Sequence, residues 1–162
     1  MIWSKAFMVL LAFLVLMNIK ITVEGIEVNG EVRQDRSANH AEIYKTVSGA
    51  VEDNGWMTCR SKEEVRSFLS RYFEGFLLDE LTEKTWNFIK EPTDWYSLAR
   101  VVDLKILYSD GNRAVAEAII RIEDVDTGHN EFGKGLFAMT YKGEGWKINY
   151  VCFNWGTQSE DR

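Results

Sequence analysis

The hydrophobic pattern of the chain has a helical period before Pro92 and a period of two after it. Between Ser61 and Leu77, apolar residues recur every three or four positions, which is typical of one face of a helix. These residues are Val65, Phe68, Leu69, Tyr72, Phe73 and Phe76. Glu64 follows Ser61 at the spacing of a capping box, in which each side chain accepts a hydrogen bond from the other residue's backbone N–H. The pattern therefore predicts a helix over Ser61–Leu77.

A second, shorter helix is predicted over Thr82–Ile89, with Thr82 as its cap and with Trp86 and Ile89 on its buried side. The two helices would form an αα-hairpin around Glu74–Leu81. The stretch before them, residues 26–56, is polar and nearly free of aromatic residues. Its Ile43, Val47 and Val51 recur every four residues, which allows a short helix over Ala41–Val51. Otherwise this stretch is a linker or a loosely attached arm.

Four strands are predicted after Pro92, each with apolar residues at alternate positions. They are Arg100–Ser109, Arg113–Val125, Glu131–Lys142 and Trp146–Trp155. In the last of them Trp146, Ile148, Tyr150 and Cys152 are in phase and are expected on one face. Consecutive strands joined by hairpins form an antiparallel meander, and the helices are the elements available to cover one face of it. The sequence thus predicts an α+β fold of two N-terminal helices packed on a four-stranded antiparallel sheet.

Three segments of this arrangement resemble the nuclear transport factor 2-like superfamily, the cystatin-like α+β cone. They are SKEEVRSFLSRYFEGFL in the first helix, GNRAVAEAIIRI in a middle strand and GEGWKINYV in the last strand, and the resemblance spans about Met57–Trp155. It implies a curved sheet that wraps the long helix and leaves a conical cavity. Some members of the superfamily are isomerases or cyclases, and many are catalytically silent domains attached to signal or membrane segments. The resemblance implies the fold more than any activity, because one fold supports many functions.

An apolar run, Ala6–Met17, stands at the start of the chain after Lys5. Its length suits the core of a signal peptide and is short of the roughly 20 residues that span a bilayer. Residues 1–25 are therefore interpreted as an export signal, or as an uncleaved membrane anchor if Lys20 snorkels. The expected organisation is completed by a polar linker or arm over residues 26–56, one domain over 57–157 and a polar tail over 158–162. The expected location is secreted or at the cell surface, with a single-pass anchored protein as the alternative.

The chain carries 19 basic and 25 acidic residues, a net charge of −6. This balance argues against nucleic acid as a partner and against attraction to anionic lipid, so contact with a membrane is expected only through residues 1–25. The two cysteines, Cys59 and Cys152, could form one disulfide in an oxidising compartment or remain two buried thiols.

Candidate chemistry is sparse. In ketosteroid isomerase-like members of the superfamily a helix tyrosine stabilises an enolate oxygen, and the resemblance offers Tyr72 for that role. The mechanism also needs a carboxylate base, which the sequence does not assign. His40 and His129 stand alone, and the stretch from Asp124 to Glu131 fits a polar hairpin better than a calcium loop because its glycine is one place early. No catalytic residue, metal or cofactor is therefore predicted.

The aromatic residues exceed what a small core needs, and some are expected to line the cone. The predicted pocket consists of Tyr72, Trp86, Phe137, Met139 and Tyr150. Trp95 and Trp155, near the ends of elements, could instead contribute to a contact patch for a protein.

The leading hypothesis is an exported, non-enzymatic domain that binds a protein partner or a small apolar ligand. The alternatives are an isomerase- or hydratase-like enzyme that uses the cone, and an anchored component of an envelope or conjugation assembly. A homodimer formed through an exposed strand is a further expectation from the superfamily.

Overall fold

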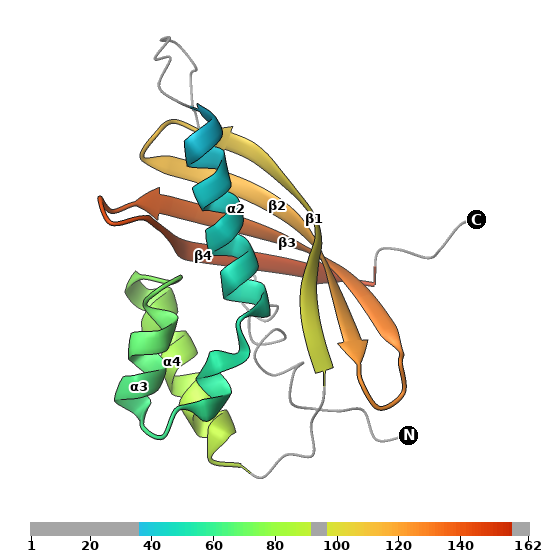
Figure 1. Ribbon diagram of the computed structural model, residues 1–162. Helices are drawn as coiled ribbons and strands as arrows, with labels where there is room; N and C mark the ends of the chain where they lie inside the picture. The colour runs from blue at the N-terminus through green and yellow to red at the C-terminus, as the bar shows by residue number, and fades with distance from the viewer. Residues whose placement is uncertain (1–35, 92–96, 157–162) are drawn as a thin grey trace, which may run out of the picture.

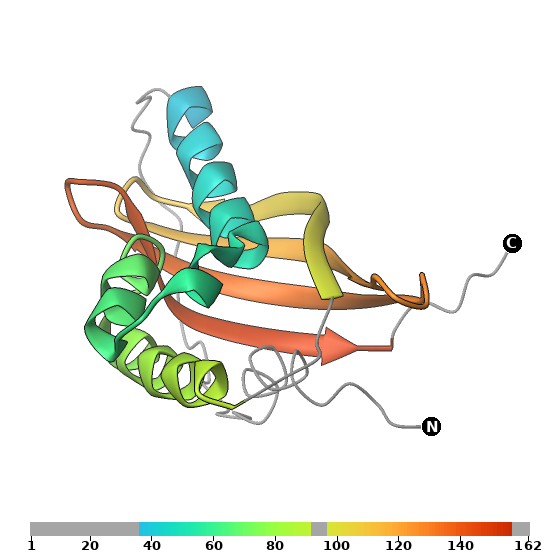
Figure 2. The same ribbon diagram turned by 60° about the horizontal axis from the view of Figure 1, so that its bottom comes forward.

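The computed structural model describes residues 36–91 and 97–156. Their helices are α2 (Arg36–Glu52), the short 3-10 helix η1 (Asn54–Thr58), α3 (Lys62–Leu69) and α4 (Gly75–Ile89). Their strands are β1 (Ser97–Ser109), β2 (Arg113–Asp124), β3 (Asn130–Tyr141) and β4 (Trp146–Trp155). Figures 1 and 2 show α2, α3 and α4 on the same side of one curved sheet. The predicted α+β class is confirmed, with three α-helices on the sheet in place of the two expected.

The sheet is an antiparallel meander in the order β1-β2-β3-β4. At the middle of its inner face, which is turned toward the helices, alanines on β2 lie beside large side chains on β3 and β4. Ala114, Ala116 and Ala118 lie beside Phe137, Met139 and Ile148, and all six are buried. The small side chains beside the large ones let the helices pack closely against the middle of the sheet. The strands match their predicted bounds to within three residues, because their period of two is strong.

The phase predicted for the last strand is correct to Ile148 and then fails. Ile148 is paired with Met139 and Tyr150 with Ala138, so Asn149 is an extra residue that forms a bulge. Beyond it Val151 and Phe153 are buried in the core. Tyr150 and Cys152 therefore lie on the outer face of the sheet, where the simple alternation had not placed them.

The helix considered over Ala41–Val51 exists, is longer, and packs in the core. Ile43 and Val47 on α2 have 0% exposed surface. At the N-terminal end of α2, Asn39 accepts a hydrogen bond of 2.6 Å from the indole of Trp146. The alternative of a linker or loose arm is therefore wrong for residues 36–52. The spacing of four residues between its apolar side chains correctly indicated a helix, although the rest of the stretch is polar.

The predicted helix over Ser61–Leu77 is wrong, because it is broken in the middle. Ser61 caps α3 as expected, and its side chain accepts a hydrogen bond from the N–H of Glu64. The chain then leaves the helix and pairs with the edge of β4: Ile148 donates to the Tyr72 carbonyl at 2.8 Å, and the Glu74 N–H donates to the Ile148 carbonyl at 3.0 Å. These bonds satisfy backbone groups of the edge strand, which a continuous helix would leave unpaired.

A new helix, α4, begins at Gly75, whose φ of +62° suits glycine. Thr82 consequently lies inside α4 and is not a cap; its hydroxyl donates to the Leu78 carbonyl. Phe76, expected on the buried stripe, is 72% exposed because the break reset the helix phase.

No helix within residues 36–91 is both long and apolar enough to cross a bilayer. Residues 1–35, 92–96 and 157–162 lie outside the described part of the chain. The predictions that concern the apolar run, Pro92, Trp95 and the polar tail therefore also fall outside it.

Candidate functional site

A small cavity lies between the helices and the inner face of the sheet. Its walls come from the end of α2, from η1, α3 and α4, and from strands β3 and β4. The lining is apolar except for Asp53 and the hydroxyl of Tyr72. Its volume is about 40 Å³, whereas pockets for small organic molecules span roughly 300–1,000 Å³. Between the helices and the sheet, the described side chains therefore leave little space at this cavity.

Tyr72 and Asp53 meet at this cavity. The Tyr72 hydroxyl donates a hydrogen bond of 2.7 Å to Oδ2 of Asp53. The same carboxylate lies 3.3 Å from Nη2 of Arg71, and its Oδ1 accepts from the N–H of Gly55 at 3.0 Å. Tyr72 lies so close to α2 that a Cβ atom on Gly49 would come within 2.4 Å of its ring. The cluster of Asp53, Arg71 and Tyr72 therefore joins the end of α2 to the end of α3.

The ionisation of this cluster is set by its hydrogen bonds. Partial burial acts to raise the pKa of the Asp53 carboxyl, but the bonds from Tyr72 and Gly55 and the charge of Arg71 together outweigh it, so the pKa lies below its usual value. Burial, followed by the hydrogen bond to Asp53, raises the pKa of Tyr72. At neutral pH the pair is a carboxylate and a neutral phenol. The phenol proton is held by Asp53, so it does not point to an oxyanion, and the carboxylate is too well satisfied to act as a strong base.

The structure brings together only some of the predicted pocket residues. Tyr72 and Phe137 line the cavity. Met139 is buried in the core, away from the cavity wall. Trp86 packs against the core from α4, with the ammonium of Lys90 5.5 Å from its ring centroid. Tyr150 lies on the opposite face of the sheet, because the bulge at Asn149 reverses the alternation of side chains along β4.

The two cysteines are free thiols on different sides of the sheet, which corrects the expected disulfide. Cys59 follows η1 and packs against the core on the helix side. Cys152 alternates with the buried Val151 and Phe153, so its side chain points to the outer face beside Tyr150. The sheet itself separates the two sulfur atoms. A bridge would require the bulge or the end of β4 to rearrange.

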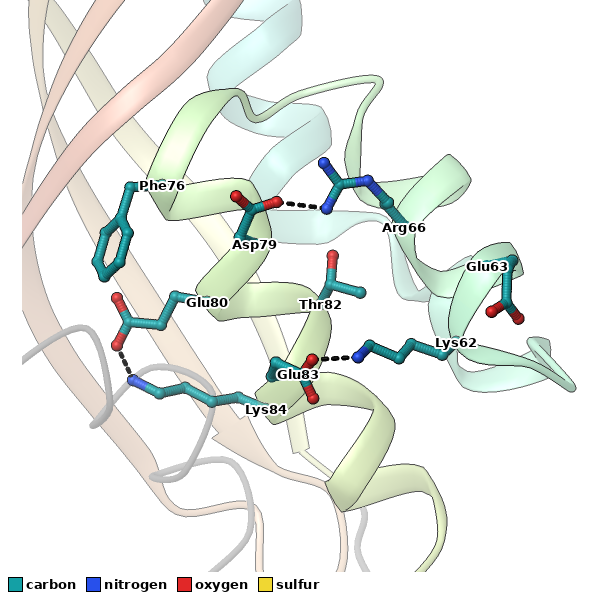
Figure 3. A pocket seen from close by; sticks show the side chains of 9 residues that line it. All are labelled: Lys62, Glu63, Arg66, Phe76, Asp79, Glu80, Thr82, Glu83 and Lys84. Carbon is teal, nitrogen blue, oxygen red and sulfur yellow. Dashed lines mark hydrogen bonds and ion pairs between the residues drawn. The ribbon is translucent and has the colours of Figure 1, made fainter.

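A second hollow, open to solvent, runs between α3 and α4 (Figure 3). Its volume is about 520 Å³ and its lining is mainly charged. Lys62 forms an ion pair with Glu83 and Arg66 with Asp79, so the two helices are joined across it. Lys84 and Glu80 pair along α4. These charges largely neutralise one another, and we interpret the hollow as the exposed seam of a helix pair.

The loop from Asp124 to Asn130 is a hairpin turn, as its sequence predicted. The carboxylate of Asp124 accepts hydrogen bonds from the N–H groups of Asp126 and Thr127, at 3.1 and 2.9 Å. Gly128 has a φ of +67°. Within residues 36–91 and 97–156, no group of three or more His, Cys, Asp and Glu residues is placed to hold a metal ion.

Sequence reasoning missed Asp53 and Trp56, which both line the cavity. They lie in the stretch interpreted as a linker. Asp53 precedes Asn54 and Gly55 and caps η1, and an Asp-Asn-Gly sequence is a signal for a turn or a cap. That signal could have identified a turn, but it gives no indication that Tyr72, nineteen residues later, contacts Asp53.

Comparisons with known proteins agree on the fold alone. No protein-family model matches the sequence, and no curated protein matches it. One similar solved structure is a protein from Novosphingobium aromaticivorans, provisionally described as an aromatic ring hydroxylase; it is 12% identical, with a TM-score of 0.51, over 75% of this chain and 91% of that chain.

A second similar structure is Bd1075 from Bdellovibrio bacteriovorus, 15% identical with a TM-score of 0.50. The match covers 83% of this chain but only 46% of that one, so it spans less than half of Bd1075. Such identities establish a likeness of fold, a cone-like α+β arrangement, and carry no activity with them.

Proposed function

We propose that this chain is an exported, non-enzymatic binding domain of the nuclear transport factor 2-like superfamily, and that it acts through a protein partner. The observation that carries the proposal is the small volume, about 40 Å³, of the cavity that the described residues form between the helices and the sheet. A space of that size accommodates one or a few water molecules and no substrate. Of the two binding modes that the sequence left open, a protein at the surface therefore fits better than an apolar ligand inside.

The convergence of Tyr72 and Asp53 at the cavity is the one observation that favours the enzymatic alternative. A catalytic carboxylate must exchange protons with substrate, and a tyrosine that stabilises an oxyanion must present its proton to it. Here the two groups satisfy each other, and Arg71 and Gly55 complete the coordination of the carboxylate. We therefore assign the pair a role in holding α2 to α3.

Export is supported by the apolar run Ala6–Met17 and by its length. Mass spectrometry of the N-terminus after expression in the source cell tests this part. A mature chain that starts near Ile26 supports export by a cleaved signal, whereas an intact Met1 supports the anchored alternative.

The binding mode is tested by photo-crosslinking the full chain in its source cell, followed by native mass spectrometry of the purified protein. We expect a reproducible protein adduct and no co-purifying small molecule. A tightly bound apolar ligand, or turnover of a carbonyl substrate that is lost in Tyr72→Phe, would overturn the proposal.

A further inference from the structure

The outer face of the sheet is covered by none of the described helices. All three helices lie on the inner side (Figures 1 and 2). We define the outer face by the side chains that alternate with the buried ones. From β1 and β2 these include Arg100, Asp103, Lys105, Val115, Glu117, Ile119 and Arg121, and from β3 and β4 Phe132, Lys134, Leu136, Ala138, Tyr150 and Cys152. Val115, Ala138 and Tyr150 form one apolar row across three strands, and Leu136 and Cys152 lie in the next row.

The charge of this face is opposite to that of the whole protein. The outward positions of β1, β2 and β3 carry five basic residues (Arg100, Lys105, Arg113, Arg121 and Lys134) and three acidic residues (Asp103, Glu117 and Glu123). The full chain has a net charge of −6. This face therefore has a small excess of positive charge, although Arg113 pairs with Asp110 and Lys134 with Glu117.

Two arginines on this face, one on β1 and one on β2, repel each other. Arg100 and Arg121 are directly opposite each other in the β1–β2 register. Like charges at opposed positions destabilise a sheet. Arg100 forms no ion pair within the described part of the chain, and Arg121 has only a contact of 3.6 Å to Glu123. The Nε of Arg121 is buried and lacks a hydrogen-bond partner among the described residues.

We infer that the outer face is a docking surface for an acidic segment of a partner protein, with Arg100 and Arg121 receiving its carboxylates. This deepens the proposed function and rests on it. A carboxylate between two guanidinium groups would relieve their repulsion, and guanidinium groups bind carboxylates in a bidentate manner. Phe132, which is paired with Arg121, and Ile119, in the next row of the same face, place apolar side chains beside the two arginines, which suits a partner that alternates acidic and apolar residues. A polyanion such as nucleic acid, or an anionic membrane, fits less well because the chain is acidic and three carboxylates interrupt the face.

The first test needs no partner. Replacing Arg100 by Glu puts opposite charges across the two strands, so we expect the free protein to become more stable, with a melting temperature raised by about 2–4 °C. Lys105 is the matched control, because it lies on the same strand and faces Glu117. Lys105→Glu creates a like-charge pair and should lower the melting temperature. If Arg100→Glu also lowers the melting temperature, the two arginines do not repel each other, and a docking role based on their repulsion is excluded.

The second test uses a displayed library of random 12-residue peptides, selected on the full chain and on the Arg100→Glu and Arg121→Glu variants. We expect the wild-type protein to enrich peptides that combine Asp or Glu with apolar residues, and both variants to retain them about tenfold less well. Inorganic phosphate, a short RNA duplex and phosphatidylserine vesicles serve as competitors.

Each other outcome of the selection contradicts the inference. Enrichment of neutral or basic peptides, equal retention on the variants, or no enrichment at all excludes an acidic partner at this face. Binding of the RNA or of the vesicles in place of peptides assigns the face to those ligands. If crosslinking in the source cell maps a partner to α3 and α4 instead, the proposed function stands and this inference falls.

Discussion

The two faces of the sheet are built from the same strands but follow different rules. On the inner face, Phe137 is 2% exposed and its ring lies edge-on to Phe153, with centroids 5.6 Å apart. On the outer face the next residue, Leu136, is only half-buried and lies between Glu117 and Cys152. The inner face is close-packed, so adding or removing a single methylene group there changes the stability of the protein. The outer face is constrained by charge and by whatever contacts it. Burial of apolar side chains on the inner face therefore stabilises the fold, whereas the side chains of the outer face can contact a partner.

The largest expected effect comes from truncating neighbouring residues on the two faces. Phe137→Ala should lower the free energy of unfolding by about 3–5 kcal/mol, because it removes a buried ring and leaves a cavity beside one that already exists. Leu136→Ala, the matched control, should cost less than about 1 kcal/mol, because its side chain is already partly in water. Urea unfolding monitored by tryptophan fluorescence measures both. Equal losses would show that the outer face is also part of the core.

A smaller effect is expected where the inner face depends on the absence of a side chain. A Cβ atom on Gly133 would lie 2.2 Å from the ring of Trp155. Gly133→Ala should therefore destabilise the protein by about 1–3 kcal/mol unless the ring moves. Lys134→Ala, one position further along β3 on the outer face, should be nearly neutral. Thermal unfolding distinguishes them, and a shifted tryptophan emission in Gly133→Ala would report the displaced ring.

The loss of stability in acid should depend on the cluster of Asp53, Arg71 and Tyr72 at the cavity. The folded pKa of Asp53 is depressed, so its ionised form stabilises the fold above the unfolded pKa of the carboxyl, and this contribution is lost as the pH falls through the depressed value. Asp53→Asn should cost on the order of 1 kcal/mol at neutral pH and flatten the decline in acid.

Tyr72→Phe, which removes one donor to the carboxylate, should flatten the same decline in part. Denaturant unfolding at a series of pH values measures the slopes. An Asp53→Asn curve parallel to that of the wild-type protein would contradict the assignment.

The smallest effect is expected from the ion pair on the outer face. Lys134 lies 3.2 Å from Glu117, and both side chains are substantially exposed. Such pairs contribute little, so Lys134→Met should change stability by no more than about 0.5 kcal/mol. Measuring the free energy of unfolding in low and in high salt isolates the contribution of the ion pair, which should be smaller at high ionic strength. A loss above 1 kcal/mol would mean that charge on this face is structural.

The candidate site was harder to predict than the fold, for a reason visible in particular residues. Tyr72 and Phe137 were predicted to lie at the cavity and do line it, because both belong to stretches of sequence with strongly periodic apolar residues. Tyr150 was misplaced by a bulge of one residue, and Asp53 was overlooked because its partner is distant in the chain. The alternation of apolar residues along a strand identifies which of them share a face. A single inserted residue moves all later side chains to the opposite face.

The sequence by itself determined the four strands, their hairpins, the cap at Ser61 and the α+β class, because these depend on contacts between residues close in the chain. Only the tertiary structure decided that α2 belongs to the core, that the helix breaks at residues 70–74 to pair with β4, and that the two cysteines lie on opposite sides of the sheet. The break is the clearest case. Continuing the helix would satisfy residues 70–74 locally, whereas leaving it satisfies the edge of β4 as well, and that edge lies more than seventy residues away in the sequence.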